Sequence, residues 1–382
     1  MQRTNLAAAL LLALSAKAYA GKPEGGSKHI ALGAEYRTEF IHDDHGIQKL
    51  ATEKPPTTNS FRLTDTKIVL AGEFSESTNF RVRLNVNADS WQLGNPADLP
   101  EVAYGTMRLN NHLSLTIGKD LVLQGGWDNF DNEYDAIWGS TIYLAPFKYY
   151  APTATFAFNQ SYGTLSLQLT NDVTTNSGIT TAITKDTHVN TSHTDGISNT
   201  NNRQPTFILD YRGSYRAGML RPLLQMGQYD LNHSRFIDLG VKIARGPLHV
   251  TFDYLLDNRA STSKGGRDKF LTYTLTALRV DYNINDIAKP FIYFAQANRT
   301  GEKNVYGVDI TTNSIKNADF SSSTLYGNDN ASIMSLGASY LGFGANYVPY
   351  LVYHGGSGKY DLSGSEKSGA QTSIRLGVMG AI

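Results

Sequence analysis

Residues 80–89, FRVRLNVNAD, alternate apolar and polar side chains five times in succession. The even-numbered residues, from Phe80 onward, are apolar, and the odd-numbered ones, from Arg81 onward, are polar or charged. Because successive side chains of a β-strand point to opposite faces, this pattern predicts a strand with one apolar and one polar face. The segment 66–74, TKIVLAGEF, precedes it across the five residues SESTN. The two segments are therefore predicted to form a hairpin.

Segments of this kind recur along the chain, and we count about sixteen of them. They are residues 29–40, 61–74, 80–89, 101–109, 113–119, 152–158, 164–171, 206–212, 219–229, 236–244, 248–256, 270–282, 290–298, 332–340, 346–354 and 372–382. Short turns of about three to seven residues take every second break, and the other breaks are mostly longer and polar, which is typical of transmembrane barrels.

The length of the segments favours a membrane-spanning barrel, and their charged residues indicate which face meets lipid. Ten residues tilted near 45° project to about 23 Å, close to the apolar band of an outer-membrane barrel. Strands of a soluble β-sandwich, which is the competing fold, are shorter, about 5 to 6 residues. A charged face that includes Arg81 and Arg83 cannot meet hydrocarbon. The chain is therefore predicted to be all-β, a 16-stranded antiparallel transmembrane β-barrel with short periplasmic turns, long extracellular loops and a water-filled lumen.

The N-terminal region predicts export. Arg3 is followed by the apolar run LAAALLLALSA and by an A-x-A site before Gly21, so residues 1–20 are expected to be a signal peptide. Residues 21–382 are then a single barrel domain. The whole chain has 34 basic and 34 acidic residues, and loss of Arg3 and Lys17 leaves a slight acidic excess, which predicts no nucleic-acid partner. The chain has no cysteine, but a closed sheet needs no disulfides because it leaves no free edge.

Residues 61–119 resemble the family of Gram-negative outer-membrane porins that includes the phosphate-selective (O/P-type) porins. The order of FRLTDTKIVLAGEF, FRVRLNVNAD, EVAYGTMRL and LSLTIGK follows that family's order of strands. The resemblance implies a sixteen-stranded barrel, a homotrimer and a third loop folded inward as a constriction. Residues 120–123 replace the Pro-Phe-Gly element common there, so solute selectivity is not carried over. The family also usually ends in an aromatic residue, whereas this sequence ends in Ile382.

Selective passage of solutes and ions depends mainly on the electric field that charged side chains create at the narrowest point of the pore. The stretch 126–139, in the third outer loop, is rich in carboxylates, and the wall of the barrel offers arginines. The candidate acidic residues are Asp128, Asp131, Glu133 and Asp135, and the candidate basic ones are Arg37, Arg81 and Arg83. Alternatively, the loop is a solvated surface loop and the arginines pair with Glu35, Glu39 and Glu73 on neighbouring strands.

Other charged residues alternate in step with the polar face and are therefore also expected to point into the lumen. They include both acidic and basic residues, which argues against a continuous row of basic residues that would conduct anions. They are Lys67, Arg212, Lys242, Arg279, Arg375, Asp65, Asp210, Asp238, Asp253 and Asp281. We find no motif for catalysis, a metal or a cofactor. His42-Asp43-Asp44-His45 is interpreted as a solvated turn rather than a metal site.

The leading hypothesis is a channel of the cell outer membrane through which small polar solutes and ions diffuse passively. Its expected partners are lipid, lipopolysaccharide and two further copies of the chain. The alternative hypothesis is a barrel that serves as a platform for an enzyme or adhesin, with the long loops at residues 172–204 and 299–330 as the active parts.

Overall fold

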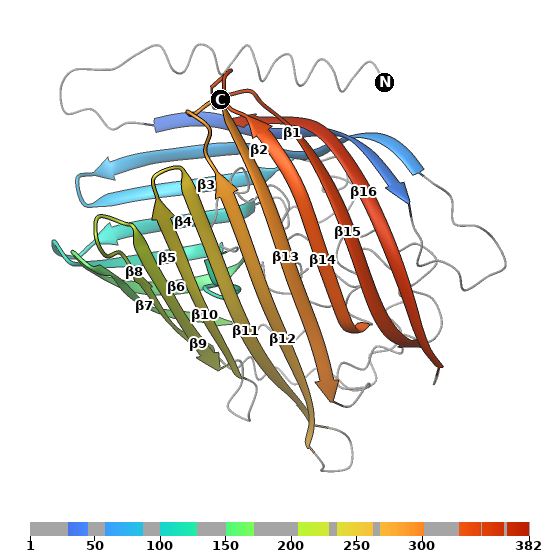
Figure 1. Cartoon of the computed structure of the whole chain (residues 1–382). Coiled ribbons are helices and arrows are strands. Elements are labelled where there is room, and N and C mark those ends of the chain that lie inside the picture. Colours follow the sequence, from blue (N-terminus) through green and yellow to red (C-terminus); the bar gives the residue numbers. More distant parts are fainter. Residues whose placement is uncertain are drawn as a thin grey trace.

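The computed structural model describes ten stretches of the chain, and their strands form one closed barrel (Figure 1). The described residues are 30–44, 58–86, 100–127, 150–171, 205–228, 235–262, 268–301, 328–344, 346–362 and 365–381. They contain sixteen strands: β1 (Ile30–Asp44), β2 (Thr58–Ser75), β3 (Thr78–Asn85), β4 (Pro100–Arg108), β5 (Leu113–Leu121), β6 (Tyr150–Gln160), β7 (Gly163–Asn171), β8 (Pro205–Gly213), β9 (Leu220–Gln228), β10 (Arg235–Arg245), β11 (Leu248–Thr262), β12 (Asp268–Tyr282), β13 (Ala288–Gly301), β14 (Asn328–Tyr340), β15 (Val348–Leu362) and β16 (Ser365–Ala381).

Each strand pairs antiparallel with its neighbours in sequence, and β1 closes the sheet against β16. The closing register runs from Glu35 opposite Ala381 to Asp44 opposite Thr372. Figure 1 shows these first and last strands side by side. Closure gives every strand two hydrogen-bonded partners, so the sheet has no free edge. This confirms the predicted fold class.

No helix among the described residues is long and apolar enough to span a membrane.

The two faces of the wall differ as the alternation predicts. Along β10, Ile237 and Leu239 point outward and are exposed, whereas Phe236 and Asp238 point inward and are buried. Outward apolar side chains of this kind continue around the barrel. They include Met107, Ile117, Phe156, Leu167, Leu209, Phe252, Leu278, Ile292, Phe294, Leu336, Leu351 and Leu376. An isolated barrel that exposes so much apolar surface in a continuous band is suited to a lipid environment.

Aromatic side chains cluster at the end of the barrel where the short turns lie. The rings of Phe74 and Phe80 stack with centroids 4.7 Å apart across the β2–β3 turn. At the β14–β15 turn, the ring of Phe343 lies 5.0 Å from that of Tyr340 and 5.7 Å from that of Tyr347. Such residues form the girdle that marks the membrane interface of outer-membrane barrels.

The inner face is less uniformly polar than the sequence pattern suggests. Along β11–β16 it carries a cluster of buried apolar side chains, which are Leu255, Leu275, Ala277, Phe291, Tyr293, Ala295, Ala297, Ile333, Val348, Tyr350, Val352 and Met379. Alternation alone does not reveal this cluster, because both faces of these strands contain apolar residues. Buried polar side chains, such as Thr251, Arg279 and Ser335, share the inner face of these strands with the apolar cluster.

The predicted segments all correspond to strands, but several strands extend further towards the long loops. β11 continues to Thr262, six residues beyond the predicted end, and β12 pairs with it along that whole extension. Apart from Ala260, the residues of this extension, such as Asn258, are polar or charged. Backbone pairing does not need apolar alternation, so the ends of these strands carry no period-2 signal.

Nitroxide labels on β3 test the orientation of its faces. We expect labels at Val82 and Leu84 to be accessible to oxygen dissolved in lipid, and labels at Arg81 and Arg83 to be accessible to a water-soluble nickel reagent. The two sets lie on opposite faces of one strand, so each is the control for the other. The reverse accessibility would overturn the assignment of the lumen.

Candidate functional site: the third loop on the inner wall

The third loop starts inside the barrel. It comprises residues 122–149, of which 122–127 are described, and these six residues are all buried. Four of their backbone amides donate hydrogen bonds to side chains of distant strands. The bonds join Leu123 N to Gln168 Oε1 (2.9 Å), Gly125 N to Asp238 Oδ2 (2.7 Å), Gly126 N to Gln225 Oε1 (3.2 Å) and Trp127 N to Asp253 Oδ1 (2.9 Å).

These acceptors lie on β7, β9, β10 and β11, so the loop crosses the inner face of several strands after leaving β5. Backbone amides buried away from water need partners, and here the barrel wall supplies them. Two of the acceptors are carboxylates, whose hydrogen bonds are stronger than those of neutral groups. Residues 122–127 are therefore attached to the wall by their backbone, independently of most of their side chains.

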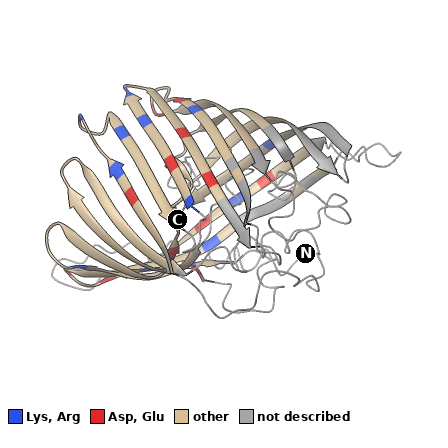
Figure 2. Ribbon diagram, turned by 90° about the horizontal axis from the view of Figure 1, so that it is seen from below, with Lys and Arg blue, Asp and Glu red and all other residues tan. Residues whose placement is uncertain are grey.

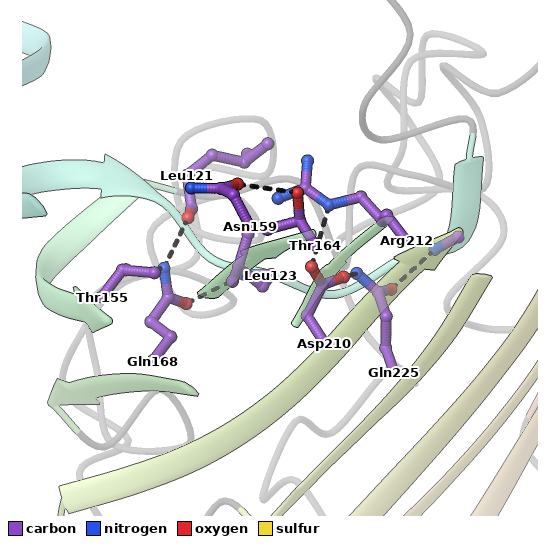
Figure 3. Close-up of polar contacts among 10 residues, drawn as sticks. Leu121, Leu123, Thr155, Asn159, Thr164, Gln168, Asp210, Arg212 and Gln225 are labelled. Carbon is purple, nitrogen blue, oxygen red and sulfur yellow. Dashed lines mark hydrogen bonds and ion pairs between the residues drawn. The ribbon is translucent and has the colours of Figure 1, made fainter. Parts of the chain in front are cut away.

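Gln168 holds the point where the chain leaves β5. Its amide nitrogen donates to the carbonyl of Leu121 (3.0 Å) and to the hydroxyl of Thr155 (3.1 Å), while its amide oxygen accepts from Leu123. Figure 3 shows Gln168 between these three groups. A buried amide with both ends satisfied defines the position of the turn into the lumen.

The acceptor for Gly126 is itself held in place. Gln225 donates from Nε2 to Asp210 Oδ1 (2.9 Å), and Arg212 Nε donates to the other oxygen of Asp210 (2.9 Å), as Figure 3 shows. Asp210 and Gln225 are both completely buried. The amide oxygen of Gln225 is thereby oriented towards the loop.

Trp127 ends the described part of the loop in a close-fitting site. Its indole nitrogen donates to the carbonyl of Arg221 (3.2 Å), and Lys242 Nζ lies 4.7 Å from its ring centroid. A Cβ at Gly240 would lie 2.8 Å from Trp127 Cδ1 and would also collide with the carboxylate of Asp253. Only glycine at 240 leaves room for both groups.

The predicted basic residues lie on the opposite part of the wall. Arg81 and Arg83 are on β3, eight strands from β11 around the barrel, and their side chains point inward. Arg83 is 13% exposed and Arg81 is 42% exposed. Arg37 is also on the inner face, on β1. The structure thus brings the three arginines to one side of the lumen.

These arginines have acidic neighbours, in part as the alternative interpretation predicted. Arg83 Nε lies 2.9 Å from Glu101 Oε2, and Glu35 lies 3.6 Å from Arg81 Nη2 and 3.9 Å from Arg83 Nη1. Lys67 Nζ joins the group at 3.5 Å from Glu101. Glu39 Oε1 accepts a hydrogen bond from the hydroxyl of Tyr350 (2.7 Å). Glu101 was not among the predicted partners, because the bulge between β3 and β4 displaces it from simple cross-strand pairing.

Acidic and basic positions are mixed along the strands of the barrel, as Figure 2 shows. Of the additional inward candidates, Lys67, Arg212, Lys242, Arg279, Arg375, Asp210, Asp238, Asp253 and Asp281 share the inner face, according to the strand registers. Asp210, Asp238 and Asp253 belong to the attachment of the third loop or to its support. Their alternation with apolar residues predicts only that they line the wall, because parity gives the face of a residue but not its partner.

The four predicted acidic residues of the third loop, Asp128, Asp131, Glu133 and Asp135, lie outside the described residues. So do the predicted signal peptide and Ile382. In the part of the chain that the structure describes, no group of three or more histidine, aspartate or glutamate residues could hold a metal ion.

No family model matches this sequence, and no curated protein matches it either. Solved structures do match. The outer-membrane channel DcaP of Acinetobacter baumannii superposes with a TM-score of 0.60 at 9% identity, over 94% of this chain and 99% of that one. The chain has the porin fold. Two further solved structures have the same fold. OmpT of Vibrio cholerae in its trimer form matches with a TM-score of 0.56 at 10% identity, over 94% of this chain and 100% of that one. OmpF of Salmonella typhi in complex with daunomycin matches with a TM-score of 0.54 at 10% identity, over 92% of this chain and 97% of that one.

This porin fold is that of an outer-membrane β-barrel, and the similarity extends over nearly the whole chain. The narrower resemblance to phosphate-selective porins depends on residues 61–119 alone and stays a prediction. Because about one residue in ten is identical, these matches establish the shared architecture but do not assign a role to any side chain of this chain.

Proposed function

We propose that this chain is a porin of the cell outer membrane, through which small hydrophilic solutes and ions diffuse passively, and that its third loop narrows the lumen. The observation that carries the proposal is the attachment of residues 122–127 to the inner wall by four backbone amides. A segment anchored in this way occupies part of the cross-section of a sixteen-stranded barrel, which is otherwise wide enough for an aqueous channel.

The same attachment supports a role for the acidic residues that follow Trp127. Asp128 is the next residue after this buried anchor, so the chain enters the remainder of the loop from inside the barrel. We propose that Asp128, Asp131, Glu133 and Asp135 form one side of the constriction and that Arg37, Arg81 and Arg83 form the other. Opposed acidic and basic sides orient dipolar solutes and rank ions weakly by charge.

We further propose that the outward apolar band contacts outer-membrane lipid and lipopolysaccharide, and that the chain forms a homotrimer. The exposed band and the aromatic side chains at the short turns support the first part. The second part is supported by the similarity in fold to OmpT of Vibrio cholerae, whose structure is a trimer form. Chemical cross-linking in detergent followed by size analysis tests the number of copies.

Recording from planar lipid bilayers tests the channel. We expect the purified protein to produce stepwise openings in the nanosiemens range, grouped in threes if the trimer inserts as a unit. Heat-denatured protein is the control, because the boiled chain has no barrel. A bilayer that stays sealed after insertion of folded protein would refute the channel function.

Charge substitutions test the proposed constriction. Replacing Asp128, Asp131, Glu133 and Asp135 by Asn is expected to lower the permeability of cations relative to anions, because the loop then loses four negative charges. Replacing Arg37, Arg81 and Arg83 by Gln is expected to shift the ratio in the opposite direction. The reversal potential in a salt gradient measures both. An unchanged reversal potential in the first variant would place the acidic loop outside the constriction.

A further inference from the structure

A polar cavity of about 210 Å³ lies at the end of the barrel where the short turns are. It is bounded by the turns that join β2 to β3 and β4 to β5, and it reaches Asn159 at the end of β6. A cavity of this volume has room for several water molecules or for a small solute. Its lining includes Glu73, Glu76, Asn79, Thr106, Arg108 and Asn159.

The strand registers place this cavity on the inner wall. Asn79 pairs with Thr106 and shares the face of Arg81, and the hydroxyl of Thr106 lies 2.8 Å from that of Thr116 on β5. The outward neighbours at the same level, Phe74 and Met107, are exposed apolar residues. A solute that travels through the lumen therefore passes the cavity at the mouth formed by the short turns.

The cavity contains charges of both signs. Within the described part of the chain, no ion pair or side-chain hydrogen bond involves Glu73, Glu76 or Arg108. They differ in this respect from Arg83 on the same inner wall, which has Glu101 at 2.9 Å. Both carboxylates and the guanidinium are thus available to a ligand.

The chemistry of the lining limits what can bind. Leu113 is the apolar side chain in a lining of carboxylate, amide, hydroxyl and guanidinium groups, so an apolar ligand would leave polar groups without partners. A simple cation would match the two glutamates and leave Arg108 without a counter-ion. A simple anion would match Arg108 alone. A solute that carries an ammonium and a carboxylate satisfies both signs at once.

We propose that this cavity is a binding site for small zwitterions of the amino-acid type. The ammonium group contacts Glu73 and Glu76, the carboxylate accepts from Arg108, and the neighbouring amide and hydroxyl groups bind what remains. The charged side chains are exposed to water, so binding is weak and allows release. The proposal rests on the channel function only for the route by which the solute reaches the cavity.

Binding is measured with the full chain in detergent micelles by saturation-transfer NMR, with L-serine as the probe. Ethanolamine, glycolate and glycerol serve as the ammonium-only, carboxylate-only and uncharged comparisons. We expect L-serine to bind with a Kd in the millimolar range, and each comparison compound to bind at least about fivefold more weakly, because each lacks one or both charged contacts.

Two variants test the assigned contacts. Arg108→Gln and the double variant Glu73→Gln/Glu76→Gln are each expected to weaken L-serine binding by about fivefold or more. Arg245→Gln, which removes an exposed arginine at the short-turn end of β10 on the outward face, is the matched control and should leave binding unchanged. Heat-dependent mobility in detergent gels verifies that every variant forms a barrel.

Three results would overturn the proposal. They are no detectable L-serine binding, equal binding of ethanolamine or glycolate, and binding that neither variant weakens. Any of them together with normal bilayer conductance refutes the zwitterion site and leaves the channel standing. Conversely, bilayers that stay sealed would refute the channel function. If L-serine binding still depended on Arg108 in that case, the zwitterion site would remain supported.

Discussion

Replacing Gly240 by Val is expected to raise the single-channel conductance by about twofold, because it displaces the third loop from the wall and widens the lumen. A Cβ at this position lies 2.8 Å from Trp127 Cδ1 and collides with the carboxylate of Asp253, which accepts the hydrogen bond from Trp127 N. The added side chain and Trp127 cannot both occupy the site. The barrel itself is expected to persist, since valine is well suited to a β-strand.

The control for this variant is Gly105→Val on β4. An added Cβ at Gly105 has its nearest neighbour at 3.8 Å, the carbonyl oxygen of Asn79, and it points away from the lumen. We expect its conductance to equal that of the unmodified protein. Asp253→Ala removes the acceptor without adding volume and is expected to raise the conductance as well. If both Gly240→Val and Asp253→Ala fold and conduct normally, residues 122–127 do not limit the current.

Replacing Val82 by Arg is expected to destabilise the folded barrel in lipid by about 2 to 4 kcal/mol, which is the cost of an arginine at the midplane of the lipid-facing surface. Val82 lies in the middle of β3 on the outward face, where its cross-strand partners are Leu70 and Ala103. The native chain already has arginines one residue away on either side. The expected loss of stability therefore comes from placing the charge on the lipid-facing side of the strand and not from arginine as a residue type.

Urea titration of the protein folded into vesicles, followed by the heat-dependent shift in gel mobility, measures the free energy of unfolding. Arg81→Gln is the control. The Arg81 side chain is 42% exposed and its guanidinium lies 3.6 Å from Glu35, so its loss is expected to change stability by about 0 to 1 kcal/mol. Equal stability of Val82→Arg and the unmodified protein would mean that this surface does not face hydrocarbon.

The sequence alone was sufficient for the architecture. Alternation along residues 80–89 predicted which side chains of β3 face lipid, and the rhythm of short and long breaks predicted a closed meander of sixteen strands. Both features are local, because a strand has a period of two whatever its partners are. The same parity placed Arg81 and Arg83 on the inner wall, although it did not identify Glu101 as their neighbour.

The extra length of β11 and the apolar cluster inside β11–β16 were beyond such reasoning. Polar residues extend a strand whenever the neighbouring strand supplies hydrogen bonds, and an apolar residue on the inner face cannot be distinguished from one on the outer face by its type alone. In both cases the deciding contact involves a strand that is adjacent in the sheet.

The position of the third loop is the clearest example of what only the tertiary structure decided. Gly125, Gly126 and Trp127 are bound by Asp238, Gln225 and Asp253, which are between 99 and 126 residues away in sequence. The donors are backbone amides, which every residue except proline has, so no side-chain pattern in the loop marks them. Periodicity determines the face to which a side chain points, but closure of the barrel determines which groups meet across the lumen.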